Sequence, residues 1–137
     1  MLLAIGLQES EFIARQQGGT SKKAGTGPAK SWWQFEKSGG VKELLENQTT
    51  RPILLPVCTL LGYPEWTADA LHEAMEHNDV LAVVMARLLL YLDKDEMPES
   101  DQVWKGWKIY VRRWRPGVER PKVWPKNFTF AWSLIRT

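Results

Sequence analysis

Residues 79–92, DVLAVVMARLLLYL, form the strongest predicted helix of the chain. Apolar side chains occupy nearly every side of this segment, and a helix that is apolar all round belongs in the interior of a protein. Asn78 stands directly before the segment and is one of the residue types that cap a helix N-terminus. We therefore expect a buried central helix against which the other elements pack.

The flanking sequence is predicted to be helical as well, because it shows no convincing alternation of period two. Thr67 is a candidate N-cap for the preceding helix, Ser100 with Asp101 is a candidate cap for the following one, and Pro56 should kink or restart its segment. The predicted helices cover residues 2–16, 41–47, 52–61, 68–76, 79–92, about 102–114 and 125–135, and a loop covers residues 20–30. The chain has 137 residues and no domain boundary, so we expect one all-α domain over residues 1–137.

The composition excludes several classes of protein. Cys58 is the single cysteine, so an internal disulfide is ruled out, and its apolar neighbours place it in the core. His72 and His77 lie five positions apart, which does not fit a helical metal pair. We expect both histidines in solvent and no metal or cofactor. No segment approaches the ~20 apolar residues of a membrane span, and the opening run does not resemble a secretory signal.

Glu9 is a carboxylate within the apolar stripe of the first predicted helix. Five residues three, four or seven positions away share its face: Leu2, Ile5, Gly6, Phe12 and Ile13. An ionised carboxylate is costly to bury, so such a group tends to raise its pKa and keep its proton near neutral pH, as a general acid must. The alternative is a structural ion pair with Arg15 or Lys30, and position alone does not decide between the two.

A second segment, residues 27–36 with the sequence GPAKSWWQFE, follows the first helix and a Gly-rich loop. Together with the pair Glu9-Ser10, it resembles the catalytic core of the lysozyme-like superfamily, specifically the lytic transglycosylases and goose-type lysozymes used in phage lysis proteins. Residues 31–34 occupy the position of the family's Gly-Leu-Met-Gln motif, with Ser31 in place of the glycine. Tyr110 stands where the family has an Ala-Tyr-Asn motif, with Val111 in place of the asparagine.

The resemblance implies a lysozyme-like helical domain with a substrate groove. It implies cleavage of the β-1,4 bond between N-acetylmuramic acid and N-acetylglucosamine in peptidoglycan, with Glu9 as the general acid. Glu36 is the candidate for a second catalytic carboxylate. The alternative is that Glu36 is only a solvated residue at the start of a helix. The residues that the resemblance assigns to substrate binding are Ser31, Trp32, Trp33, Gln34 and Tyr110. If their segment is extended, Trp32 and Trp33 should face opposite ways. Whether the product is a reducing end or a 1,6-anhydro sugar is left open.

The expected setting is phage lysis. The enzyme would be made in the host cytoplasm without a signal peptide, and would reach the cell wall through a holin-type pore or from a virion. We expect a monomer.

The stretch 104–126 is strongly basic, with eight lysines and arginines against Glu119 alone. It favours contact with polyanions, here anionic polymers of the cell envelope, although a merely solvated face explains it equally well. Three tryptophans interleave with these cations, a composition that nucleic-acid-binding domains share, but that function leaves Glu9 unexplained, so we expect no nucleic acid. A glycan-binding module without catalysis is a further alternative. Most of the eight tryptophans should be core residues.

Overall fold

The computed structural model describes residues 1–15 and 28–135. The predicted loop 20–30 and the predicted end of the first helix therefore lie largely outside the described residues. The described helices are α1 (Leu2–Ser10), a short π-type turn η1 (Lys37–Val41), α2 (Lys42–Glu46), α3 (Arg51–Leu60), α4 (Ala68–His77), α5 (Asp79–Tyr91), α6 (Val103–Trp114) and α7 (Trp124–Ile135). In this part of the chain β-pairing is limited to one isolated bridge between Lys30 and Phe35. The predicted all-α class is confirmed.

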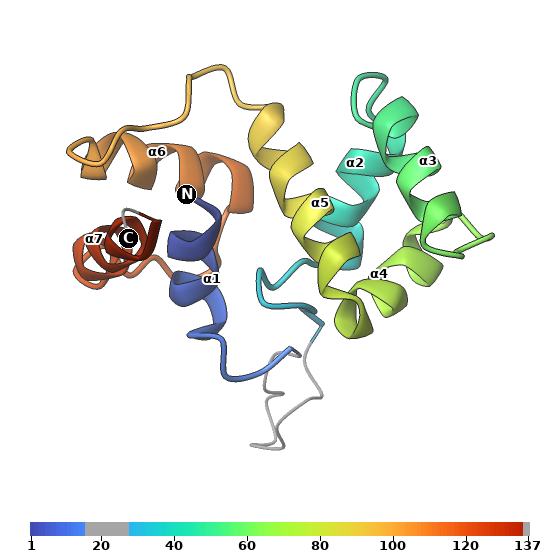
Figure 1. The fold of residues 1–137 in the computed structure, drawn as a ribbon, viewed down its shortest axis with the longest axis horizontal. Helices are drawn as coiled ribbons and strands as arrows, with labels where there is room; N and C mark the ends of the chain where they lie inside the picture. Colours follow the sequence, from blue (N-terminus) through green and yellow to red (C-terminus); the bar gives the residue numbers. More distant parts are fainter. Residues whose placement is uncertain (16–27, 136–137) are drawn as a thin grey trace.

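Helix α5 lies between two groups of helices, with α1, α6 and α7 on one side and α2, α3 and α4 on the other (Figure 1). Asn78 caps α5 as predicted, since its Oδ1 accepts a hydrogen bond from the Leu81 amide at 3.0 Å. Seven of the thirteen residues of α5 are buried. The central helix thus supplies an apolar surface to both groups.

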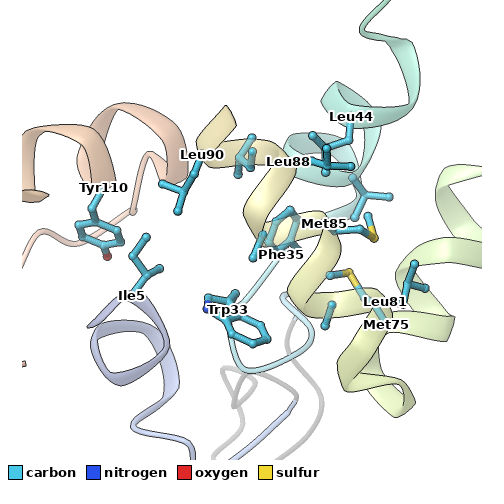
Figure 2. Packing of buried hydrophobic residues seen from close by; sticks show 14 of the residues in the cluster. Ile5, Trp33, Phe35, Leu44, Met75, Leu81, Met85, Leu88, Leu90 and Tyr110 are labelled. Atoms are coloured by element: carbon cyan, nitrogen blue, oxygen red, sulfur yellow. The ribbon is translucent and has the colours of Figure 1, made fainter. Parts of the chain in front are cut away.

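The core is a single cluster that runs from Ile5 and Tyr110 at one end, past Trp33 and Phe35, to Met75 and Leu81 near α4 (Figure 2). Cys58 belongs to this core, as predicted. Six of the eight tryptophans are buried in the cluster or packed against it, whereas Trp66 and Trp104 are exposed. Of these six, Trp33 and Trp124 are buried core residues and the other four are partly exposed, so fewer tryptophans are core residues than predicted.

Helix α1 ends at Ser10, six residues earlier than predicted. Glu11 and Phe12 have φ angles of 53° and 55°, and two left-handed residues cannot continue a right-handed helix. Phe12 folds back over Gly6 so closely that a Cβ on that glycine would lie 2.3 Å from Cζ of the ring. Ile13 consequently lies outside the buried face on which the helical pattern had placed it, with 78% of its surface exposed.

Three other expectations need correction. Helix α3 runs continuously through Pro56, with Pro52 in its first turn. Helix α6 has Gln102 at its N-cap, without a side-chain capping bond, in place of the expected Ser100 and Asp101 cap. His72 is buried and not solvated, because α4 packs its ring against the carbonyl oxygen of Phe35, at 2.9 Å.

The predicted N-cap of α4 is confirmed, since Thr67 accepts a hydrogen bond from the Ala70 amide at 3.1 Å. His77, at the other end of α4, is exposed, as the sequence predicts. Among the described residues, no helix combines the length and the apolar character that crossing a membrane requires.

Candidate active site

Glu9 occupies the last turn of α1, where its carboxylate meets a side chain from α6. The hydroxyl of Tyr110 donates a hydrogen bond to Oε1 of Glu9 at 2.6 Å. Tyr110 is itself buried, and its ring stacks on that of Trp124 from α7 with centroids 5.3 Å apart and planes 8° from parallel. Three helices therefore fix the position of the Glu9 carboxyl relative to the core.

The environment of Glu9 favours the protonated acid. Burial raises the pKa of the carboxyl above its ordinary value of 4.5, while the hydrogen bond from Tyr110 and the positive charge of Arg120 act in the opposite direction and are weaker. Burial and the neighbouring Glu9 charge raise the pKa of Tyr110 as well, so its hydroxyl stays a donor at physiological pH. The pair thus combines a carboxyl prone to hold its proton with a permanent hydrogen-bond donor.

The ion pairs considered for Glu9 do not form. Arg15 pairs with Asp79, at 2.9 Å between Nη2 and Oδ2. Lys30 pairs with Glu73 and Glu76 instead, and its Nζ lies 3.0 Å from Oε2 of Glu76. In the described ranges, 1–15 and 28–135, no cation lies within ion-pair distance of Glu9. The alternative that Glu9 forms a structural ion pair with Arg15 or Lys30 is therefore wrong.

Residues 31–34 form a tight turn closed by the Lys30–Phe35 bridge. The amide of Lys30 donates to the Phe35 oxygen at 2.9 Å, and the Phe35 amide donates to the Lys30 oxygen at 2.8 Å. Ser31 and Gln34 adopt left-handed φ angles of 69° and 51°, a conformation that non-glycine residues usually keep only where the surroundings enforce it. The side chain of Gln34 is held within the turn, because its Nε2 donates to the Ser31 oxygen at 2.7 Å.

Neighbouring helices hold this turn in place. The indole of Trp114, on α6, donates to the Trp33 oxygen at 2.8 Å, and the indole of Trp33 donates to the Leu2 oxygen at 2.8 Å. His72 contacts the Phe35 oxygen from α4, and the Ser10 hydroxyl donates to the Trp32 oxygen at 2.8 Å. Contacts from α1, α4 and α6 therefore enforce the strained backbone.

A cavity of about 470 Å³ opens beside Glu9. It is lined by α1, the segment from residue 29 to residue 43, α5, α6 and the chain that follows α6. The lining residues are Gln8, Glu9, Ala29, Gln34, Phe35, Glu36, Gly39, Gly40, Glu43, Leu89, Tyr110, Arg113, Trp114, Arg115, Pro116, Gly117, Val118 and Arg120. Four of the candidate site residues from the sequence therefore line the same cavity: Glu9, Gln34, Glu36 and Tyr110.

The other three, Ser31, Trp32 and Trp33, do not line this cavity. Ser31 is fully buried, and its hydroxyl accepts a hydrogen bond from the Trp33 amide at 3.2 Å. Trp33 packs into the core with 5% of its surface exposed. Trp32 packs against the core while partly exposed, and the guanidinium of Arg15 covers its ring at 4.3 Å from the centroid. These residues shape the turn that carries Gln34.

The sequence did not identify several polar residues of the cavity as site residues. Gln8 was missed although it interrupts the same apolar stripe as Glu9, which was an available signal. Its Nε2 donates to the Arg120 oxygen at 3.1 Å, the guanidinium of Arg120 donates back to the Gln8 oxygen, and Oε1 of Gln8 accepts from Asn127 at 2.9 Å. The three arginines of the lining were recognised only as part of a basic stretch, because nothing local relates them to Glu9.

The carboxylates of the lining differ in their surroundings. Glu43 lies 3.5 Å from Nη1 of Arg113 and 3.4 Å from Nη2 of Arg115. Glu36 is exposed at the start of η1. Glu9 is partly buried and has a raised pKa, and among the described residues it forms no ion pair. A separate group on α4, made by Glu73, Glu76 and His77, has ligand atoms within 4.8 Å of one another, but Lys30 already pairs with both glutamates.

The chain matches no protein-family model, no curated protein and no solved structure. Its chemistry is therefore inferred from the cavity and the residues that line it.

Proposed function

We propose that this chain is a peptidoglycan-cleaving glycosidase of the lysozyme or lytic transglycosylase type, with Glu9 as its general acid. The supporting observation is a carboxyl whose pKa is raised by burial, hydrogen-bonded to Tyr110 and lining a cavity together with Gln34. A carboxyl kept protonated near neutral pH is the usual proton donor to a departing sugar oxygen. The resemblance of the Glu9-Ser10 pair and of residues 31–34 to the lysozyme-like superfamily supports the same reaction.

The proposed reaction has two proton transfers. In the first, Glu9 donates its proton to the glycosidic oxygen while the bond between that oxygen and the anomeric carbon of the muramic acid breaks, and the sugar becomes oxocarbenium-like. In the second, the Glu9 carboxylate takes a proton from the incoming nucleophile. If the nucleophile is water, the product has a reducing end; if it is the sugar's own C6 hydroxyl, the product is a 1,6-anhydro sugar.

Gln34 and Tyr110 have supporting roles in this proposal. The amide of Gln34 spends one N–H on the Ser31 oxygen and keeps a second N–H and its carbonyl oxygen for an acetamido group of the substrate. The Tyr110 hydroxyl orients the acid and stabilises the carboxylate formed after proton donation. Where water is the nucleophile, Glu36 is the candidate to take its proton in place of Glu9, because it lines the same cavity and is not paired with arginines as Glu43 is.

The contacts of the arginines and tryptophans in the basic stretch 104–126 argue against the nucleic-acid alternative. Arg112 is engaged by Asp93 and Asp95, and Arg113 by Glu43 and Asp93. Trp107 and Trp114 pack against the core, so two of the three rings interleaved with the basic residues are turned inward. Phosphate contacts and base stacking would both need these groups in solvent.

The decisive experiment compares wild type, Glu9→Gln and Glu11→Gln for release of soluble muropeptides from purified sacculi. Removing a general acid typically costs ~10²- to 10⁴-fold in rate, so Glu9→Gln should release at least about a hundredfold less. Glu11 is exposed and outside the cavity, and its variant should stay within about twofold of wild type. Mass spectrometry of the products separates the two reactions, because reducing and anhydro ends differ by one water.

Two results would contradict the proposal. Equal release by wild type and Glu9→Gln would show that Glu9 is not the acid. Binding of wild type to sacculi without any release of muropeptides would indicate a glycan-binding module.

A further inference from the structure

One wall of the cavity carries three arginines that the proposed proton transfers do not use. Arg113, Arg115 and Arg120 line the same space as Glu9, and the other carboxylates of the lining are Glu36 and Glu43. The described lining therefore holds three arginines and three carboxyl groups, and burial disfavours the charged form of one of these, Glu9. The arginines are the groups of this lining that attract anions.

Arg113 is committed to the protein itself. Its side chain is 16% exposed and lies between Glu43, at 3.5 Å, and Asp93, at 3.6 Å. Arg113 thus has little freedom to turn toward a ligand. Its charge adds to the potential of the cavity, while the contacts with a ligand must come from the other two arginines.

Arg115 is the more accessible of the two. Its Nη2 lies 3.4 Å from Glu43, well beyond the ~2.7–2.9 Å of a strong charge-assisted hydrogen bond, and its side chain is 69% exposed. The residue also ends α6 with a left-handed φ of 47°, a position where glycine is the favoured residue. The backbone conformation thus does not favour an arginine at this position, whereas a role of its charge in the cavity would explain one.

Arg120 brings its charge close to the proposed acid. The guanidinium donates to the carbonyl oxygen of Gln8, the residue directly before Glu9, and its charge lowers the pKa of the Glu9 carboxyl. In the part of the chain that the structure describes, Arg120 forms no ion pair with a carboxylate. A guanidinium has five N–H donors, so donors remain for a ligand beside Glu9.

We infer that Arg115 and Arg120 form a subsite for an oxyanion carried by the substrate next to the bond that is cleaved. This inference rests on the proposed function. In peptidoglycan, muramic acid carries a peptide on its lactyl ether, and the free carboxylates of that peptide are the closest anions to the glycosidic bond. Phosphates of wall polymers offer the same oxyanion chemistry from another source.

The test compares peptidoglycan with a version whose peptide carboxylates have been converted to amides by carbodiimide and ammonia. The glycan and the bond to be cleaved are the same in both. Hydrofluoric acid removes phosphate polymers from a third sample and so identifies which oxyanion is recognised. Wild type should cleave the amidated substrate with a kcat/KM about tenfold lower, mostly through KM, and should be unaffected by the removal of phosphate.

Arg115→Gly is the most informative variant, because glycine suits the left-handed backbone and should leave the fold intact. It should raise KM for native peptidoglycan about tenfold, and its preference for native over amidated substrate should shrink accordingly. Arg120→Gln should act in the same direction. The matched control is Lys122→Gln, since Lys122 is exposed in the same basic stretch and does not line the cavity, and it should keep the preference of wild type.

Failure of the inference and failure of the proposed function are distinguishable. If wild type cleaves native, amidated and phosphate-free peptidoglycan equally well, or if Arg115→Gly and Arg120→Gln keep the full preference, the subsite is overturned while the glycosidase stands. If wild type cleaves neither, the proposed function is overturned. Cosedimentation of Glu9→Gln protein with both kinds of sacculi then decides the subsite without turnover: equal binding to both overturns it.

Discussion

Tyr110 and Glu9 are separated by 101 positions in the chain, yet their side chains meet at 2.6 Å. Because the hydroxyl donates to the carboxylate, it stabilises the charged form and lowers the pKa of Glu9 against the larger effect of burial. The proposed reaction would use both effects on the pKa of Glu9. Burial would keep the proton available for the first step, and the hydrogen bond would stabilise the carboxylate that acts as a base in the second step.

Replacing Tyr110 with phenylalanine should move the pH dependence of the reaction in a defined direction. Without the hydrogen bond the pKa of Glu9 rises further, so the acid stays protonated to higher pH. The alkaline limb of kcat/KM against pH should shift upward for Tyr110→Phe, while the maximal rate should fall ~10-fold or less because the acid is less well oriented. A limb that moves to lower pH would show that Tyr110 does not stabilise the carboxylate.

Single residues also show how far the sequence could predict the site. Glu9 was found because one carboxylate in an apolar stripe is a local anomaly, and Gln34 and Tyr110 were found through resemblance to known motifs. The arginines were not found, because the contact between Arg120 and Gln8 joins residues 112 positions apart. Trp32 and Trp33 were expected to face opposite ways in an extended segment, but residues 31–34 form a turn and both rings contact Phe12. Both residues lie outside the lining of the cavity.

At the scale of elements, the sequence predicted helices better than their ends. The central helix and the caps Thr67 and Asn78 follow from local chemistry, and all three are confirmed. The end of α1 depends on Phe12 folding back over Gly6, a tertiary contact that a 3.6-residue pattern does not encode. His72 was assigned to solvent because α4 looks polar, but α4 turns this polar residue toward the carbonyl of Phe35.

An ion pair with one buried side chain lies in the connection between α5 and α6. The Asp93 side chain is 1% exposed and accepts bonds from Arg112 at 2.9 Å and 2.6 Å, and the arginine holds the pKa of Asp93 below its usual range. Arg112 is 33% exposed and keeps its contact with Asp95, so Asp93→Ala should lower the free energy of unfolding by about 1.5–3 kcal/mol, the range for a hydrogen bond to a charged group. Urea denaturation measures this change, at an unchanged m value if unfolding stays two-state.

Asp95→Ala is the matched control. Asp95 contacts the same arginine at 2.6 Å, but its side chain is 42% exposed, so the loss should stay below about 1 kcal/mol. Equal losses for the two variants would mean that burial does not distinguish these carboxylates. Because the pKa of Asp93 is lowered in the folded state, its contribution should also disappear as the pH falls through that lowered value.

For the whole molecule, the cavity is a product of the arrangement around α5. Glu9, Tyr110 and the arginines come from the group of α1 and α6 with the chain after α6 (Figure 1). Glu36 instead lies at the start of η1, and Glu43 lies in the first turn of α2. Helix α5 contributes Leu89 between them. The helical class could be predicted from periodicity, but the cavity could not, since it exists only where these distant segments meet.

Two buried titratable groups give the molecule opposite dependences on pH. Burial raises the pKa of Glu9 above 4.5, so the folded state binds more protons than the unfolded state above pH 4.5, and stability falls as the pH rises to the raised value. Burial lowers the pKa of His72 below 6.5, so the unfolded state binds more protons just below pH 6.5, and stability falls as the pH drops from there.

The two variants Glu9→Gln and His72→Gln should separate these effects. The stability of Glu9→Gln relative to wild type should increase from pH 4.5 upward until Glu9 has lost its proton, because the amide has no charge to bury. The stability of His72→Gln relative to wild type should instead increase as the pH falls below 6.5. Each unit of pKa difference corresponds to about 1.4 kcal/mol, which moves Tm by roughly 3–6 °C in a domain of this size. Thermal denaturation at half-unit steps from pH 4 to 8 measures both curves, and variant curves parallel to wild type would show that neither buried group is linked to folding.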